Sequence, residues 1–291
     1  MDAFLQTTIN GVASGSIYAL GAVGLSLVYA ILKLVNFAHG DFMTLGGYVA
    51  FAVNVSMGMP LIVAIAAAIV AIAALGLVTE ALIWRPMRNR GAGVMQMLLL
   101  SIGFAFVLRN LILFFWGGDT RELRVDNTSS YDLGIVRISL LQIIVIATAA
   151  VAMLGVGFML RSTYVGKSMR ALSDSFDLAE VSGIDTRRVV TYTWVLGGGL
   201  AGLAGVLAAI FTVLSNNTGW YLLLGIFAAI VLGGIGNPFG ALVGGLVLGL
   251  VQEWSTNWVD PTYKEAIGFV VLILALLFRP NGILGHATRT G

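Results

Sequence analysis

The stretch LIVAIAAAIVAIAALGLVTEALI, residues 61–83, carries a single charged residue, Glu80. A helix of about 20 such residues spans the hydrocarbon core of a bilayer, about 30 Å thick. The chain of 291 residues is 58% hydrophobic and only 10% charged, with a mean hydropathy of +0.96, far more apolar than ordinary soluble domains. Comparable apolar windows cover residues 4–32, 42–58, 61–83, 94–116, 138–160, 189–214, 221–236, 239–255 and 264–279.

These windows predict an all-α, polytopic membrane protein with a single transmembrane domain over residues 1–291. The windows at 221–236 and 239–255 are short and rich in glycine, so we expect about eight to ten transmembrane helices. The first window is too long, and lacks the basic start, for a cleavable signal peptide. We therefore expect a multi-pass protein of the cell membrane whose helices contact lipid.

Basic residues gather in alternate connections between the windows, which predicts the orientation of the chain. Three arginines lie in 85–90, five Lys or Arg residues lie in 161–188, and Arg279 and Arg289 lie in the C-terminal tail. The connection 117–137 mixes both charges. Loops rich in Lys and Arg stay in the cytoplasm, so we expect an outer N-terminus, a cytoplasmic C-terminus and a cytoplasmic loop at 161–188.

The loop 161–188 contains a pattern typical of an amphipathic helix. Apolar residues recur at spacings of three and four: Met169, Leu172, Phe176 and Ala179. Acidic residues lie mostly off this face, and Gly183 follows where a left-handed residue would end a helix. The pattern predicts one surface helix at about 168–182. It could pack on its own protein or on lipid headgroups; its three acids favour a protein partner.

Two segments interrupt the hydrophobic pattern, at 33–47 and 232–245, and both contain glycine. Broken helices in the two halves of a transporter indicate its transport path and inverted repeats. The first segment could instead be a solvated cytoplasmic turn, and the glycines of the second could allow close helix packing. The candidate path residues are Asn36, Phe37, His39, Gly40, Asp41, Gly46, Gly47, Gly233, Gly234, Gly236 and Asn237.

Several kinds of chemistry are not expected. The chain has no cysteine and only two histidines, His39 and His286, so neither disulfides nor a histidine metal site are predicted. GKS at 166–168 lacks the upstream glycine of a phosphate-binding loop, because Arg161 occupies that position. A net charge of +2 gives no sign of a nucleic-acid partner. Arg109, inside an apolar window, should be paired or lie near the outer interface.

Residues 166–207, GKSMRALSDSFDLAEVSGIDTRRVVTYTWVLGGGLAGLAGVL, resemble the cytoplasmic loop and following helix of ABC-transporter permeases for branched-chain amino acids, especially the H-type permease of the leucine, isoleucine and valine system. The shared residues include Gly166, Arg170–Ala171, Ala179 and Gly183–Ile184. GSIYALGAVGLSLVYAILKLVNFAHGDFMTLGGYVAF (15–51), LGGIGNPFGALVGGLVLGL (232–250) and RPNGILG (279–285) are similar to further signatures of that family.

The resemblance implies a permease subunit, not an enzyme, with an inverted-repeat architecture. The surface helix would be a coupling helix seated in a groove of a cytoplasmic ATPase, which moves it when ATP closes the ATPase dimer. The residues implied in coupling are Met169, Arg170, Ala171, Leu172, Phe176, Ala179, Gly183 and Ile184. This chain would bind no cofactor, because ATP and Mg²⁺ belong to the ATPase subunits.

The same resemblance implies two further partners: a second permease, either related or a copy of this chain, and an extracellular binding protein that delivers the substrate. Leucine, isoleucine and valine are the favoured substrates; other neutral amino acids, urea or short amides are alternatives. An ion-coupled secondary transporter is a rival hypothesis. It would need several ionisable groups within the spans, where only Asp41 is a candidate. A membrane-embedded enzyme would need a cluster of catalytic groups, which the sequence does not suggest.

Overall fold

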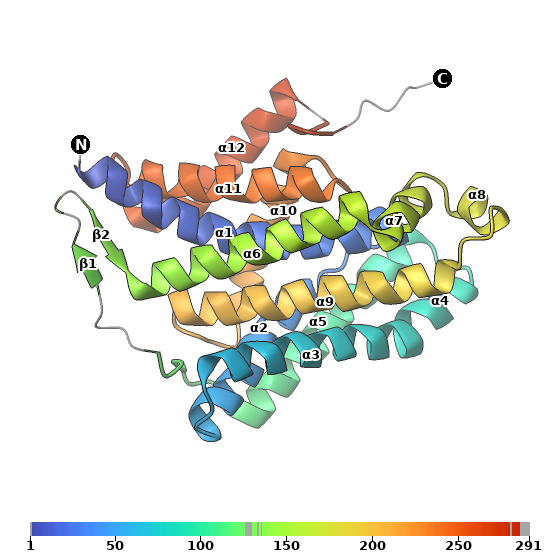
Figure 1. Cartoon of the computed structure of the whole chain (residues 1–291), viewed down its shortest axis with the longest axis horizontal. Coiled ribbons are helices and arrows are strands. Elements are labelled where there is room, and N and C mark those ends of the chain that lie inside the picture. Colours follow the sequence, from blue (N-terminus) through green and yellow to red (C-terminus); the bar gives the residue numbers. More distant parts are fainter. Residues whose placement is uncertain (1, 126–129, 133, 135, 280, 286–291) are drawn as a thin grey trace.

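The computed structural model describes residues 2–125, 130–132, 134, 136–279 and 281–285. His286 and Arg289, named above, lie outside these residues. The chain forms a bundle of roughly parallel and antiparallel helices (Figure 1). The helices are α1 (Asp2–Leu32), α2 (His39–Phe51), α3 (Leu61–Thr79), α4 (Arg85–Asn89), α5 (Val94–Trp116), α6 (Leu140–Ser162), α7 (Tyr164–Asp174), α8 (Phe176–Val181), α9 (Thr186–Phe211), α10 (Thr218–Gly233), α11 (Pro238–Ser255) and α12 (Lys264–Phe278).

Short elements extend or join these helices. A π-helical turn at Ala52–Ser56 continues α2, and another at Glu80–Trp84 joins α3 to α4. A 3-10 turn, Pro261–Tyr263, precedes α12. Strands β1 (Ser130–Asp132) and β2 (Arg137–Ser139) pair antiparallel, with Tyr131 opposite Ile138.

Every apolar window of the sequence contains a helix, and the polytopic all-α fold is confirmed. Within the described part of the chain, six helical segments are long and apolar enough to cross a membrane, or up to seven if the pair α10 and α11 forms one span. This is fewer than the eight to ten expected. The difference arises because α2 is short and because α10 and α11 meet at a bend of 119°.

Two helices, α1 and α9, form the centre of the molecule. In each, 83% of the most apolar window is buried, against 28% in the span that starts with α3, 22% in α5, 17% in α6 and 6% in the span that ends with α12. Glycine allows the central helices to pack closely. A Cβ on Gly198 of α9 would lie 2.7 Å from the Ile72 carbonyl oxygen of α3, and one on Gly15 of α1 would lie 3.1 Å from Leu246 Cα of α11.

The central helices belong to two inverted repeats. α1 is followed by the non-helical segment 33–38 and then α2; α9 is followed by a segment of equal length, 212–217, and then α10. α1 and α9 run in opposite directions (Figure 1), α1 packs extensively on α11, and α9 packs extensively on α3. The predicted inverted-repeat architecture is therefore present: α1, α2 and α3 correspond to α9, α10 and α11.

The basic and mixed-charge loops lie at opposite ends of the bundle. α4, α7 and α8 share one end, here called the basic end, with the arginines of 85–90 and the loop 161–188 (Figure 1). The N-terminus and both strands share the other end. This separation agrees with the predicted membrane topology; which end faces the cytoplasm stays a prediction.

Candidate functional site

The segment 33–38 enters the interior of the bundle instead of turning at its surface. It starts at the basic end, where Lys33 Nζ donates to the Ser173 carbonyl oxygen at 3.3 Å. It ends at His39, whose Nε2 donates to the Gly21 carbonyl oxygen at 3.0 Å. Gly21 lies eleven residues before the end of α1 at Leu32, which corresponds to about 16 Å along a helix. α2 therefore begins deep in the molecule.

Burial decides between the two readings of this segment. Asn36 and Asp41 have no exposed surface, and His39 is 1% exposed. The solvated cytoplasmic turn is therefore wrong. Non-helical backbone at membrane depth occurs only where protein or a water-filled cavity surrounds it. A role of these residues in transport stays a prediction.

The N-terminal ends of α2 and α10 meet inside the bundle. Gly40 and Gly219, each the second residue of its helix, lie so close that a Cβ on either would collide with the other's carbonyl oxygen. Thr44 Oγ1 accepts a hydrogen bond from Gly219 N at 2.9 Å and donates one to the Gly40 carbonyl oxygen at 3.2 Å. Each helix N-terminus carries a partial positive charge, so two such charges converge on one point, here called the half-helix junction.

An ion pair accompanies the half-helix junction. Arg109 of α5 donates to Asp41 through Nε and Nη2, at 2.9 and 3.2 Å, and Arg109 Cζ lies 4.7 Å from the centroid of the Trp220 ring. The pairing resolves the open question about Arg109, because a charge inside a span is costly unless it is paired or wet. The carboxylate also lies in the first turn of α2, where negative charge stabilises the helix end.

The remaining candidates of the first break have two kinds of environment. Asn36 Oδ1 accepts from Ala38 N at 3.1 Å, whereas its Nδ2 is buried without a partner in the described part of the chain. Phe37 packs on Phe227 of α10 with ring centroids 4.9 Å apart. Gly46 and Gly47 instead face α9, where a Cβ would lie 2.8 Å from Gly202 Cα and 3.3 Å from the Gly205 carbonyl oxygen, respectively. The two glycines occupy close helix contacts.

The second predicted break, 232–245, lies at the basic end and differs from the first. Gly234 and Gly236 adopt left-handed φ angles of 111° and 82°. Asn237 begins α11, since its Oδ1 accepts from Phe239 N and Gly240 N at 3.0 and 3.2 Å, and its Nδ2 donates to the Leu284 carbonyl oxygen at 2.8 Å. Gly233 approaches Gly240 closely, as the packing interpretation predicts. The segment is a tight turn that binds the C-terminal stretch.

The structural counterpart of 33–38 is therefore 212–217, which the sequence reading missed. A signal for it exists in the sequence. When α2 and α10 are aligned at their first residues, Gly40 corresponds to Gly219, Leu45 to Leu224 and Gly46 to Gly225. The repeat is too short and too degenerate to stand out without the helix boundaries.

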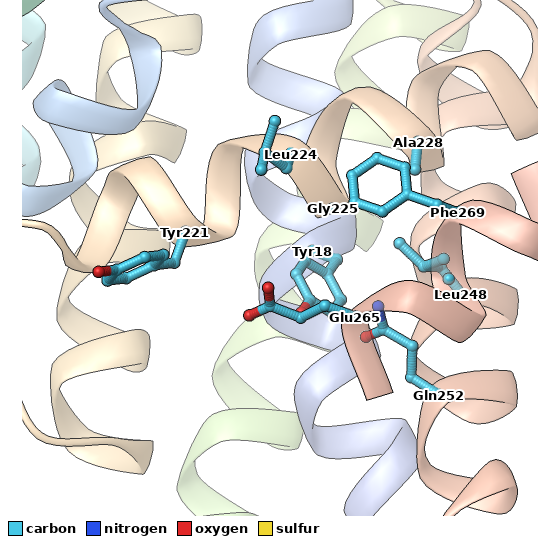
Figure 2. A pocket seen from close by; sticks show the side chains of 10 residues that line it. Tyr18, Tyr221, Leu224, Gly225, Ala228, Leu248, Gln252, Glu265 and Phe269 are labelled. Carbon is cyan, nitrogen blue, oxygen red and sulfur yellow. The ribbon is translucent and has the colours of Figure 1, made fainter. Parts of the chain in front are cut away.

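Two cavities border α10. One, of about 160 Å³, lies between α1, 33–38 and α10 and has apolar walls that include Tyr29 and Phe227. The other lies between α1, α10, α11 and α12, where Tyr18, Tyr221, Gln252 and Glu265 surround a recess (Figure 2). Its volume of about 10 Å³ holds at most one water molecule. The polar recess is therefore too small for an organic substrate in this conformation.

The predicted surface helix consists of two helices, α7 and α8. Ser175 interrupts it with an extended backbone, φ −156° and ψ 116°, and its Oγ accepts from Leu178 N at 3.3 Å. Serine favours such N-cap positions. The expectation of one continuous helix over 168–182 is therefore wrong. The helical end after Val181 is as expected, since Gly183 has a left-handed φ of 82°.

The apolar face of this loop packs mainly on its own subunit. Met169, Leu172 and Ala179 are 2%, 2% and 4% exposed, and α7 contacts α1, α6 and α9. Arg170 donates to the Leu160 carbonyl oxygen, and Ala171 and Ile184 are half-buried. The exposed apolar side chains are different ones: Phe176 is 42% exposed, Leu178 70% and Val181 88%.

Comparison with known proteins shows to which protein family the chain is related. Residues 7–276 match the family described as branched-chain amino acid transport system / permease component. The high-affinity branched-chain amino acid transport system permease proteins LivH of Escherichia coli K12 and BraD of Pseudomonas aeruginosa are 34% and 32% identical to the chain, each over 97% of it and 96% of the relative. The ribose import permease protein RbsC of Escherichia coli K12 is 28% identical over 94% of the chain and 85% of its own length.

No solved structure matches the chain. The family match covers almost the whole chain, and it includes the half-helix junction, α7 and α8. The chain therefore belongs to the family of permease components of branched-chain amino acid transport systems.

Proposed function

We propose that this chain is the membrane-spanning subunit of an ATP-driven importer, and that it passes leucine, isoleucine or valine received from an extracellular binding protein. The observation that carries the proposal is the half-helix junction at Gly40 and Gly219, together with relatives of matching length that are named for branched-chain amino acid transport. Helix ends at membrane depth offer backbone groups to a charged substrate without a fixed strong site.

The charges at the half-helix junction suit a weakly binding path for a zwitterion. Arg109 and Asp41 neutralise each other, so this pair offers no unpaired charge to trap a carboxylate or an ammonium group. The same pairing argues against an ion-coupled transporter, because the Asp41 carboxylate is already paired with the Arg109 guanidinium and is not free to bind a coupling ion. The relative named for ribose import shows that substrates differ among permeases of this kind; the relatives with higher identity favour branched-chain amino acids over urea or amides.

We infer that α7 and α8 transmit the movement of a cytoplasmic ATPase. Phe176, Leu178 and Val181 offer the exposed apolar contacts, while Met169 and Leu172 fix α7 to the spans. A push on α8 would reach α1, α6 and α9 through α7. In this arrangement ATP and Mg²⁺ are bound by the ATPase, the basic end is cytoplasmic and this chain binds no cofactor.

A second permease, a copy of this chain or a related subunit, would complete the path. The spans that contain α5 and α12 are largely unburied within this subunit, so their surfaces are open to a second subunit. Exposed Asn110 lies on the candidate span α5, and exposed Tyr221 lies on α10, which belongs to the bent pair with α11. Polar groups at such positions favour contact with protein or a water-filled cavity over contact with lipid.

Transport by the reconstituted importer tests this function. The chain, its ATPases, its second permease and its binding protein would be placed in liposomes, and uptake of radiolabelled L-leucine would be measured with and without ATP, with urea and ribose as alternative solutes. We expect ATP-dependent uptake of leucine only. Leucine uptake without the ATPases, or preferred uptake of urea or ribose, would contradict the proposal.

A further inference from the structure

A cavity of about 420 Å³ lies between α3 and α4 on one side and α8 and α9 on the other. Helices α4 and α8 lie at the basic end of the bundle (Figure 1). Its apolar wall includes Leu77 and Val190. Its charged residues are Glu80, Arg85, Arg88, Glu180 and Arg187. None of these residues takes part in the half-helix junction, so the cavity is separate from the path proposed above.

The inner charges of this cavity are already paired. Arg88 binds both oxygens of the Glu80 carboxylate, and Trp194 Nε1 donates to Glu80 Oε2 at 2.8 Å. Glu80 is only 8% exposed, and its charge is balanced by Arg88, so the inner wall of the cavity carries a net charge close to zero. Any ligand charge must therefore be balanced at the rim.

The rim is basic. Arg85 and Arg187 are exposed, and neither guanidinium has an ion-pair partner among the described residues, while Glu180 contributes one opposing charge. Thr186, the first residue of α9, also lines the cavity, so the positive end of a long helix adds to the attraction for an anion. Planar guanidinium groups bind phosphate oxygens in pairs.

The cavity also borders an exposed apolar surface formed by the end of α3 and the π-helical turn that follows it. Val78 is 51% exposed and Leu82 is 72% exposed, and they alternate along the helix with Leu77, Glu80 and Ala81, which line the cavity. A ligand at this place therefore meets arginines and hydrocarbon together. A free anion uses only the first of these features; a phospholipid uses both.

We propose that this cavity binds the phosphate-bearing headgroup of an anionic phospholipid, with Arg85 and Arg187 on the phosphate and the acyl chains along Val78 and Leu82. Basic pockets between transmembrane helices are typical sites for such headgroups. Because Arg85 is the first residue of α4 and Arg187 lies in the first turn of α9, the lipid would link two spans beside α8. The inference goes beyond the transport function proposed above.

Native mass spectrometry of the full-length chain, titrated with phosphatidylglycerol and with phosphatidylcholine of the same acyl chains, tests the proposal. We expect phosphatidylglycerol to bind on the order of tenfold more tightly than phosphatidylcholine. Each basic residue near an anionic lipid contributes an attraction that lowers Kd several-fold. The double variant R85A/R187A should lose this preference, and the charge-retaining variant R85K/R187K should keep it.

Arg188 offers a matched control. It lies beside Arg187 in the first turn of α9 but does not line the cavity, and its Nε pairs with Asp185 Oδ2 at 2.9 Å. R188A should keep the preference for phosphatidylglycerol. An equal loss in R188A, an unchanged preference in R85A/R187A, or no preference in the unsubstituted chain would overturn the proposal.

Two further outcomes identify a different ligand. If millimolar inorganic phosphate displaces phosphatidylglycerol completely, the site binds free anions and the lipid assignment is wrong. If R85A/R187A keeps its lipid preference but loses the ATPase subunit, the cavity receives a protein segment instead, which also overturns the proposal. Leucine uptake does not enter these measurements, so their failure would leave the transport function standing.

Discussion

Arg109 of α5 binds both carboxylate oxygens of Asp41 in the first turn of α2, at 2.9 and 3.2 Å. The pair joins a helix at the periphery of the bundle to the half-helix junction at its centre. Asp41 has no exposed surface, and only 14% of the Arg109 side chain is exposed. Each charge is therefore stabilised mainly by the other, because little water reaches either side chain to solvate it if its partner is removed.

Removing one member of this pair should destabilise the protein more than removing both. Breaking a buried pair leaves an uncompensated charge and costs about 3–5 kcal/mol, whereas apolar replacement of both members is often close to neutral. We expect Asp41→Leu alone to lower the thermal stability of the detergent-solubilised protein strongly, and Asp41→Leu with Arg109→Met to recover most of it. If the double variant is no more stable than Asp41→Leu alone, the unpaired Arg109 charge is not the cause of the loss.

The contact between Gly40 and Gly219 should tolerate no side chain. A Cβ on Gly219 would collide with the Gly40 carbonyl oxygen, and such overpacking costs on the order of 1–3 kcal/mol. We expect Gly219→Ala to separate α2 from α10, to lower thermal stability and to abolish leucine uptake. Gly103→Ala on α5 is the control, since a Cβ there meets no other atom within 4 Å. If Gly219→Ala transports normally, the close approach is unnecessary.

The loop at 161–188 shows what hydrophobic periodicity can predict. The spacing of Met169 and Leu172 correctly indicates the buried face of α7, whereas Phe176, predicted on the same face, is 42% exposed and lies on α8. Periodicity does not say which molecule covers that face, and here the same subunit does. The interruption at Ser175 depends on a local cap, which competes with a helix through one hydrogen bond and leaves the apolar pattern unchanged.

The half-helix junction was predictable only in part. Polar residues within an apolar stretch indicate a break near Asn36 and His39. The depth of these two residues in the bundle depends on how far the segment 33–38 runs back along α1. Hydropathy along the chain gives no information on that distance. Asn237 and its neighbouring glycines give the same signal, yet they form a turn at the basic end. The sequence therefore predicts that a helix is broken, whereas the depth of the break within the bundle is determined by tertiary packing.

Substitutions in α7 and α8 should separate docking from folding. Phe176→Asp or Val181→Asp places a charge on an exposed apolar surface, so we expect loss of ATPase association, measured by co-purification, with an unchanged melting temperature. Met169→Asp should instead unfold the protein, because Met169 is 2% exposed and a buried unpaired charge is strongly unfavourable. Normal ATPase association and normal substrate-stimulated ATP hydrolysis in Phe176→Asp and Val181→Asp would exclude this surface from docking.

The absence of cysteine from the sequence makes the orientation directly measurable. Val181 at the basic end is 88% exposed and Trp258 at the opposite end is 77% exposed, so a single cysteine at either position is open to a membrane-impermeant maleimide. Because basic loops remain in the cytoplasm, we expect Trp258→Cys to react in intact cells and Val181→Cys to react only after permeabilisation. Labelling of Val181→Cys in intact cells would place α8 outside, where no cytoplasmic ATPase could reach it.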